Sequence, residues 1–166
     1  MTRREFIGMG SVAVVAIAVA GRYALVDRIP EPPTGTFPVR RSEAQWRAML
    51  APASYHVLRE AGTERRFSSP LLKEHRKGFF ACAGCGKHVF ASDAKYDSHT
   101  GWPSFWQALP GAVVDRADHK FGRLRTEIIC TDCGGHLGHV FKDGPKPTGL
   151  RYCINGVALT FVAATA

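Results

Sequence analysis

ACAGCGK, residues 81–87, has a counterpart in ICTDCGG, residues 129–135. Each stretch holds two cysteines separated by two residues and followed by a glycine: Cys82 and Cys85 in the first, Cys130 and Cys133 in the second. A CxxC turn aims both sulfurs at one point, and the glycine lets the backbone fold around them. Together the two turns predict a tetrahedral four-sulfur site suited to Zn²⁺.

Two other interpretations of the four cysteines remain open. They could form two disulfides, which an oxidising compartment would permit. One pair could instead be a redox CxxC, although that motif usually occurs singly beside a βαβ pattern, which is missing here. The duplicated CxxCG spacing favours zinc. A four-cysteine zinc site is structural, so we expect it to hold β-sheets together while the chemistry lies elsewhere.

Outside the cysteine pairs, the pattern indicates a mainly β, antiparallel domain with short N-terminal helices. Ser42 caps a predicted helix over 42–50 with Gln45 as its capping-box partner, and Trp46, Met49 and Leu50 share one face. A second helix is predicted over 53–60, ended by Gly62. The later runs are short and bounded by turn residues, as in strands: residues 78–82, 87–90, 112–115, 123–129, 138–141 and 149–161.

The N-terminus reads as an export signal. Arg3 and Arg4 precede an uncharged run from Phe6 to Gly21, which falls short of the roughly 20 residues that span a bilayer. The start, TRREFI, resembles a twin-arginine signal for exporting folded proteins. We therefore divide the chain into a signal (1–20), a proline-rich linker (21–41) and one domain (42–166), and expect a periplasmic monomer. An uncleaved signal would tether it to the membrane.

The net charge of +8 is compatible with nucleic acid, an anionic surface or simple solubility. Export makes nucleic acid the weakest of these, and the basic residues are scattered, so we expect no nucleic-acid partner. The charge therefore indicates a solvated surface.

The fifth cysteine, Cys153, lies in GLRYCINGVALTF, residues 149–161. If this stretch is a strand, Arg151, Cys153 and Asn155 share one face, and Leu150, Tyr152 and Ile154 form the core face. A nearby cation lowers a thiol pKa and populates the nucleophilic thiolate. A buried, inert cysteine is the alternative. It would not be expected to share its face with Arg and Asn, so Cys153 is the candidate nucleophile.

Two further segments offer chemistry. In GGHLGHVFKDGP, residues 134–145, His136 and His139 are candidates for proton transfer, and Asp143 follows in a turn. They could also be metal ligands, but four cysteines already fill a zinc shell. In KYDSHTGWPSFWQ, residues 95–107, Trp102 and its aromatic neighbours could form a cradle for a small apolar group, or simply core.

Taken in order, these motifs closely resemble the methionine-R-sulfoxide reductases (B-type methionine sulfoxide reductases) over about residues 37–161. The motifs are CxxCG, KYDSxxGWPSF, RxEI and CxxCGGHLGHVFxDGPxPTGxRYCIN. The resemblance implies two antiparallel β-sheets pinned by a zinc tetrathiolate. It also implies reduction of methionine-R-sulfoxide, free or within proteins, and hence repair of oxidised proteins under oxidative stress.

The resemblance also implies roles. Cys82, Cys85, Cys130 and Cys133 match zinc ligands, and Cys153 matches the nucleophile that becomes a sulfenic acid. Trp102 matches the wall that holds the substrate methyl. The remaining matches orient or protonate the sulfoxide or support the site: His136, His139, Asn155, Arg151, Asp143 and Glu127.

One position departs from a common family pattern. Many members carry a resolving cysteine in SGCGWPSF, where this chain has SHTGWPSF with Thr100. We therefore expect the sulfenic acid to be reduced by an external thiol: a thioredoxin-like protein, a glutaredoxin or a small thiol.

Two other function classes compete with this hypothesis. A zinc-ribbon binding module without catalysis would explain the cysteine pairs but not the face shared by Arg151, Cys153 and Asn155. A thiol-disulfide oxidoreductase would use one CxxC and contain no zinc, so metal analysis with thiol counting separates it from the first hypothesis.

Overall fold

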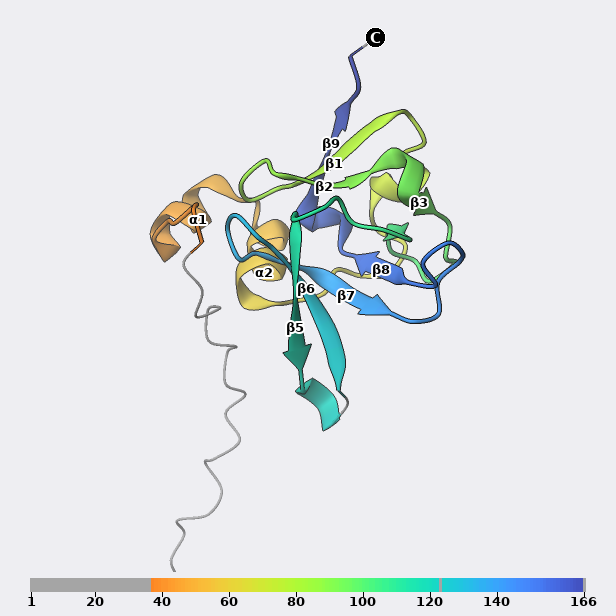
Figure 1. Cartoon of the computed structure of the whole chain (residues 1–166). Coiled ribbons are helices and arrows are strands. Elements are labelled where there is room, and N and C mark those ends of the chain that lie inside the picture. The colour runs from red at the N-terminus through yellow and green to blue at the C-terminus, as the bar shows by residue number, and fades with distance from the viewer. Residues whose placement is uncertain (1–36, 123, 166) are drawn as a thin grey trace, which may run out of the picture.

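The structure is a computed structural model that describes residues 37–122 and 124–165 (Figure 1). The predicted signal and most of the predicted linker lie outside these ranges. None of the helices in the described part is both long and apolar enough to cross a membrane. The helices are α1 (Glu43–Met49) and α2 (Pro52–Glu60), with single 3₁₀ turns η1 (Pro70–Lys73), η2 (Ser92–Ala94), η3 (Lys120–Gly122) and η4 (Gly156–Ala158). The strands are β1 (Gly78–Cys82), β2 (His88–Ala91), β3 (Lys95–Tyr96), β4 (Ser104–Phe105), β5 (Val113–Asp118), β6 (Arg125–Cys130), β7 (His136–Phe141), β8 (Arg151–Ile154) and β9 (Leu159–Ala163).

The two helices form largely as the sequence predicts. Ser42 and Gln45 make the reciprocal capping box at the start of α1, which buries Trp46. Leu50 is buried beside it, but Met49 is 47% exposed, so the expected three-residue apolar face is wrong at that position. Helix α2 begins at Pro52, and Ala61, in the left-handed conformation, ends it one residue before Gly62.

The strands form two antiparallel sheets, as expected for this fold class (Figure 1). One is a three-stranded sheet in the order β2-β1-β9. The other has six strands in the order β3-β4-β8-β7-β6-β5. Neighbouring β5, β6, β7 and β8 pair antiparallel in chain order, apart from a bulge between Ile128 and Ile129.

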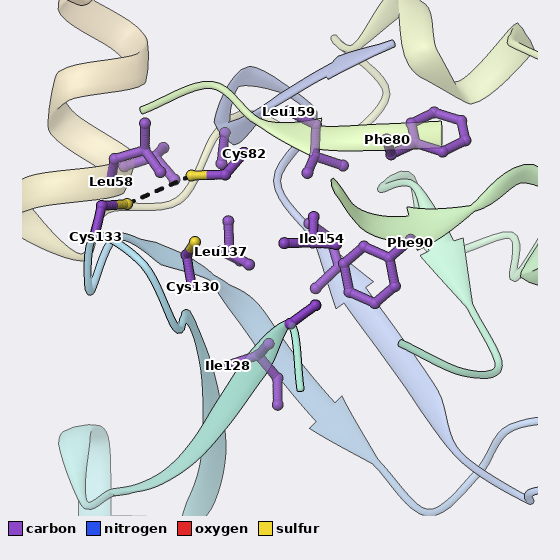
Figure 2. Packing of buried hydrophobic residues seen from close by; sticks show 14 of the residues in the cluster. Leu58, Phe80, Cys82, Phe90, Ile128, Cys130, Cys133, Leu137, Ile154 and Leu159 are labelled. Atoms are coloured by element: carbon purple, nitrogen blue, oxygen red, sulfur yellow. Dashed lines mark hydrogen bonds between the residues drawn. The ribbon is translucent and has the colours of Figure 1, made fainter. Parts of the chain in front are cut away.

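The core fills the space between the two sheets (Figure 2). Phe80 and Phe90 from the smaller sheet are fully buried, as are Ile128 and Ile154 from the larger sheet. Phe105 of β4 stacks on Phe90 with ring centroids 4.3 Å apart. Leu58 brings α2 against the same cluster, near Cys82 and Cys133. Burying such side chains contributes about 1.5–3 kcal/mol each.

The stretch 149–161 is not one strand, which corrects the sequence prediction. It divides into β8 in the larger sheet, the 3₁₀ turn η4, and β9 in the smaller sheet. Asn155 caps η4 beyond the end of β8 and does not continue the alternation from Arg151 and Cys153. The chain therefore crosses between the sheets directly after the candidate nucleophile.

Candidate active site and metal centre

The four paired cysteines converge where the two sheets meet. Their sulfur atoms all lie within 4.8 Å of one another, and two contacts join one pair to the other. Cys82 Sγ lies 3.6 Å from Cys133 Sγ (Figure 2), and Cys85 Sγ lies 3.6 Å from Cys130 Sγ. Four sulfurs around one Zn²⁺ at about 2.3 Å would be separated by about 3.8 Å. The cluster therefore has the size and chemistry to hold such an ion, and all four cysteines are free thiols in this structure, not disulfides.

The two CxxCG turns have the same backbone geometry. In the first, Cys82 N donates to Lys87 O and Gly86 N donates to Cys82 O. In the second, Cys130 N donates to Gly135 O and Gly134 N donates to Cys130 O. Gly86 and Gly134 adopt φ values of 79° and 65°. Glycine enters this left-handed region without the steric cost that a Cβ brings, which explains its place after each pair.

A single row of residues crosses all six strands of the larger sheet. The β7–β8 register places His139 opposite Cys153, and the β4–β8 register places Ser104 opposite Cys153. Directly opposite residues point to the same face, with Cβ atoms about 4.5–5.5 Å apart. From β3 to β5, this cross-strand row comprises Tyr96, Ser104, Cys153, His139, Glu127 and Arg116. The fold therefore brings the candidate nucleophile beside a histidine.

Cys153 is partly buried beside hydroxyl groups. Thr100 Oγ1 lies 3.8 Å from Cys153 Sγ, so the residue at the usual resolving position contacts the thiol directly. Ser98 links Thr100 to Ser104 through hydroxyl contacts of 2.8 and 2.7 Å.

Burial raises the pKa of the Cys153 thiol above its ordinary value of 9.0. The Thr100 hydroxyl and the Arg151 guanidinium offset only part of this effect. Arg151 therefore lowers the pKa of the Cys153 thiol, in the direction that the sequence predicts, but burial outweighs this effect in the free protein.

The two histidines are each anchored by a carboxylate. His136 Nδ1 lies 2.6 Å from Glu127 Oε1, and His139 Nε2 lies 2.8 Å from Asp118 Oδ2. Their rings meet edge to face, with centroids 5.4 Å apart. His136 Nε2 is buried and has no hydrogen-bond partner among the described residues.

The pKa directions define the protonation states at these anchors. Burial lowers the pKa of His139 below 6.5, although Asp118 acts in the opposite sense. Burial alone would raise the pKa of Asp118, but the Lys120 backbone N–H, His139 and Arg125 outweigh it and lower the pKa to about 2. At neutral pH Asp118 is a carboxylate that can only accept, so His139 is neutral with its proton on Nε2. Its Nδ1 remains an acceptor.

Glu127 is buried and ion-paired. Burial alone would raise its pKa, but His136 and Arg116 together lower it below 4.5. Arg116 Nη2 lies 2.6 Å from Glu127 Oε2. The secondary position expected for Glu127 thus corresponds to support of His136.

Arg151 and Asp143 form a bidentate ion pair at the edge of the site. Arg151 Nε and Nη2 donate to the two Asp143 oxygens over 2.9 and 2.8 Å. The guanidinium also lies over the Phe141 ring, 4.3 Å from its centroid. Asp143 therefore holds the cation that lies next to Cys153.

Trp102 and Asn155 are joined through one residue outside the row. Trp102 Nε1 donates to Glu64 O, and Glu64 N donates to Asn155 Oδ1. Asn155 is buried, and its Nδ2 donates to Leu137 O over 3.0 Å. The Asn155 amide is thus engaged by the backbone rather than placed in the row.

Two cavities flank the row. One, of about 550 Å³, is lined by residues that include Thr63, Lys120, His136 and His139. The other, of about 570 Å³, is lined by residues that include Phe67, Tyr96 and Trp102. In the cross-strand row, Cys153 lies between His139, which lines the first cavity, and Tyr96, which lines the second.

Sequence reasoning missed several residues of this arrangement. Asp118 and Arg116 lie on β5, and only the β5–β6–β7 pairing brings them to the histidines. Only Arg116 and Asp118 in VVDRAD, residues 113–118, have the two-residue spacing that places charged side chains on one face of a strand. Glu64 gave no local signal, because its partners lie far along the chain.

Comparisons with known proteins point to one family. Residues 50–163 match the family model described as the SelR domain. A protein of Bradyrhizobium diazoefficiens is 57% identical over 122 residues, which cover 73% of this chain and 88% of that protein. Proteins of Agrobacterium fabrum and Methanosarcina mazei are 53% and 49% identical over 124 residues, covering 74% of this chain and 92% and 89% of theirs. All three are named peptide methionine sulfoxide reductase MsrB.

Proposed function

The chain belongs to the SelR family of methionine sulfoxide reductases, and we propose that it is a peptide-methionine (R)-S-oxide reductase whose nucleophile is Cys153. It is an oxidoreductase that acts on methionine sulfoxide. The observation that carries the finer assignment is the register that places Cys153 directly between His139 and Ser104. A thiol, a proton acceptor and a hydroxyl on one sheet face are the groups that a sulfoxide reduction needs.

In the proposed first step, Cys153 Sγ attacks the sulfoxide sulfur. This attack forms a bond between the two sulfurs. The sulfur–oxygen bond of the substrate and the new sulfur–sulfur bond then break while the oxygen bonds to Cys153 Sγ, so methionine leaves and Cys153 becomes a sulfenic acid. Methionine sulfur is reduced by two electrons, and Cys153 sulfur is oxidised by two. The thiol proton ends on the sulfenic oxygen, so this step consumes no proton.

His139 is suited to moving that proton. Its neutral ring has an acceptor at Nδ1, and once protonated it would be stabilised by the Asp118 carboxylate 2.8 Å from Nε2. The imidazolium can then deliver the proton to the departing oxygen. In this proposal His136 and Glu127 support the same side of the site, and Arg151 stabilises the sulfur while it is anionic.

The second half-reaction requires an external thiol. The sequence has five cysteines, of which four form the cluster, and Thr100 occupies the position beside Cys153. A thiol of a thioredoxin-like protein, a glutaredoxin or a small molecule would attack the sulfenic sulfur and release water, giving a mixed disulfide. A further thiol would then free Cys153.

We also propose that the cluster holds Zn²⁺, because four thiolates with tetrahedral spacing are its preferred structural ligand set. When bound, the ion supplies structure rather than a reacting group. Residues 1–20 lie outside the described ranges, and their pattern supports the further proposal that the protein is exported to the periplasm. Fractionation of cells that express the full chain tests that assignment.

The proposed function is tested with the two epimers of methionine sulfoxide and dithiothreitol as reductant. We expect the R epimer to be reduced and the S epimer to persist. Cys153→Ser should abolish the reaction, whereas the control Thr160→Ser, at an exposed position of β9, should retain it. Consumption of the S epimer, or full activity of Cys153→Ser, would refute the assignment.

A further inference from the structure

Glu64 makes four hydrogen bonds to two segments that carry site residues. Its carboxylate accepts from Gly156 N over 2.5 Å and from Val157 N over 3.1 Å. Its backbone N–H donates to Asn155 Oδ1 over 3.0 Å, and its carbonyl accepts from Trp102 Nε1 over 3.2 Å. One residue thus fastens the 61–67 segment to the turn after β8 and to the indole.

The residues around Glu64 allow its carboxylate to come close to the backbone of Gly156. A Cβ at Gly156 would lie 1.9 Å from Ser69 Oγ and 3.3 Å from Glu64 Oε1, so a side chain there would displace both. Among the described residues no cation forms an ion pair with the Glu64 carboxylate, whose partners are the two backbone N–H groups. Burial raises the pKa of Glu64, although both N–H donors act in the opposite sense.

We propose that Glu64 is a positioning residue that holds the Trp102 indole and the Asn155 amide in place for the sulfoxide. Any residue at position 64 offers a backbone N–H and a carbonyl. Only a side chain with two acceptor oxygens can also bind both Gly156 N and Val157 N. These two hydrogen bonds keep the backbone N–H and carbonyl of residue 64 in position for Asn155 and Trp102. The inference rests on the proposed function, because it assigns Trp102 to the substrate methyl.

The test compares Glu64→Ala and Glu64→Gln with the wild type and with Glu43→Ala. Glu43 is a matched control because its side chain is 69% exposed and pairs with Arg47, which is also exposed. We expect Glu64→Ala to raise KM for methionine-R-sulfoxide by about tenfold to a hundredfold, with a smaller change in kcat. Glu64→Gln keeps one acceptor oxygen, so its KM should lie between those of the wild type and Glu64→Ala. Glu43→Ala should stay within about twofold of the wild type.

Two readouts do not depend on turnover. Acrylamide quenching of Trp102 fluorescence, isolated by subtracting the Trp102→Phe variant, should increase in both Glu64 variants because the indole loses its fixed acceptor. The alkylation rate of Cys153 by iodoacetamide should stay within about twofold, because Glu64 does not contact the thiol.

Unchanged KM and unchanged Trp102 quenching in both Glu64 variants would overturn the inference. So would a loss of activity that merely follows the loss of folded protein. If Glu64→Ala does not fold, Glu64→Gln decides by the same readouts. If the wild type reduces no sulfoxide, the proposed function is wrong. Trp102 quenching in the Glu64 variants still shows whether Glu64 holds the indole in place.

Discussion

The proposed chemistry depends on a proton that passes between Cys153 and His139, which lie opposite each other on neighbouring strands. Burial keeps the thiol protonated and the imidazole neutral in the free protein. Transfer of the proton from sulfur to nitrogen leaves the total charge of the pair unchanged, so both forms belong to one reactive protonation state. Activity is therefore expected wherever the pair holds one of these protons, and lost where it holds both or neither.

The pH dependence of kcat/KM tests this pairing. We expect an acid limb below pH 6.5, where His139 becomes charged, and an alkaline limb above pH 9.0, where Cys153 ionises. Asp118→Asn removes the anion that supports imidazolium, so the pKa of His139 should fall further and the acid limb should move to lower pH. Asp115→Asn, at an exposed position of the same strand, is the control. An acid limb that does not move in Asp118→Asn would contradict the assignment.

At the scale of elements, the CxxCG turns form the cysteine cluster, whereas the β7–β8 pair brings the residues of the candidate active site together. Each turn repeats one hydrogen-bond pattern and delivers two sulfurs, so both halves of the cluster come from local sequence. The β7–β8 pair joins residues from two neighbouring strands and places His139 against Cys153. The site therefore depends on register, since a shift by one residue would turn either side chain to the core face.

The glycine after the first pair offers a clean test of turn geometry. Gly86→Ala should lower the free energy of unfolding by about 1–2 kcal/mol, since alanine disfavours a φ of 79°. A Cβ there would meet nothing within 4 Å, so the effect comes from the backbone alone. Gly84→Ala, at an ordinary φ with its nearest contact at 3.5 Å, is the control. Equal urea midpoints for the two variants would be the contrary result.

Local sequence patterns predicted most helices and strands, but not where the chain passes from one sheet to the other. The capping box at Ser42, the CxxCG turns and the strand at 78–82 depend on neighbouring residues, and the structure confirms them. The stretch 149–161 was misread as one strand because both halves are apolar. Only pairing with distant strands divides it between the sheets. The sequence also did not predict the roles of Asp118 and Glu64, because tertiary contacts bring their partners to them.

On the scale of the whole molecule, the cysteine cluster and the hydrophobic core both join the two sheets. Cys82 ends β1 in the smaller sheet, and Cys130 ends β6 in the larger sheet. A metal bound by both pairs would therefore link the sheets directly. The site row lies on the larger sheet, so its geometry should depend indirectly on that link.

Metal removal tests the cluster. The native protein should show one reactive thiol, Cys153, and chelation under reducing conditions should expose all five cysteines while lowering the thermal midpoint. Zinc analysis before chelation should give one ion per chain. Purified active protein that contains two disulfides and no metal would contradict the zinc assignment.

We propose that Cys153 is the one residue that accepts the oxygen of methionine sulfoxide, and this proposal can be tested in a single reaction. It is tested most directly by a single turnover with methionine-R-sulfoxide in the absence of any reductant, analysed by mass spectrometry with a sulfenic-acid trap. We expect about one methionine released per active chain, with the trap attached to Cys153 and the four other cysteines unchanged. Methionine release without modification of Cys153, or a disulfide between Cys153 and a cluster cysteine, would contradict it.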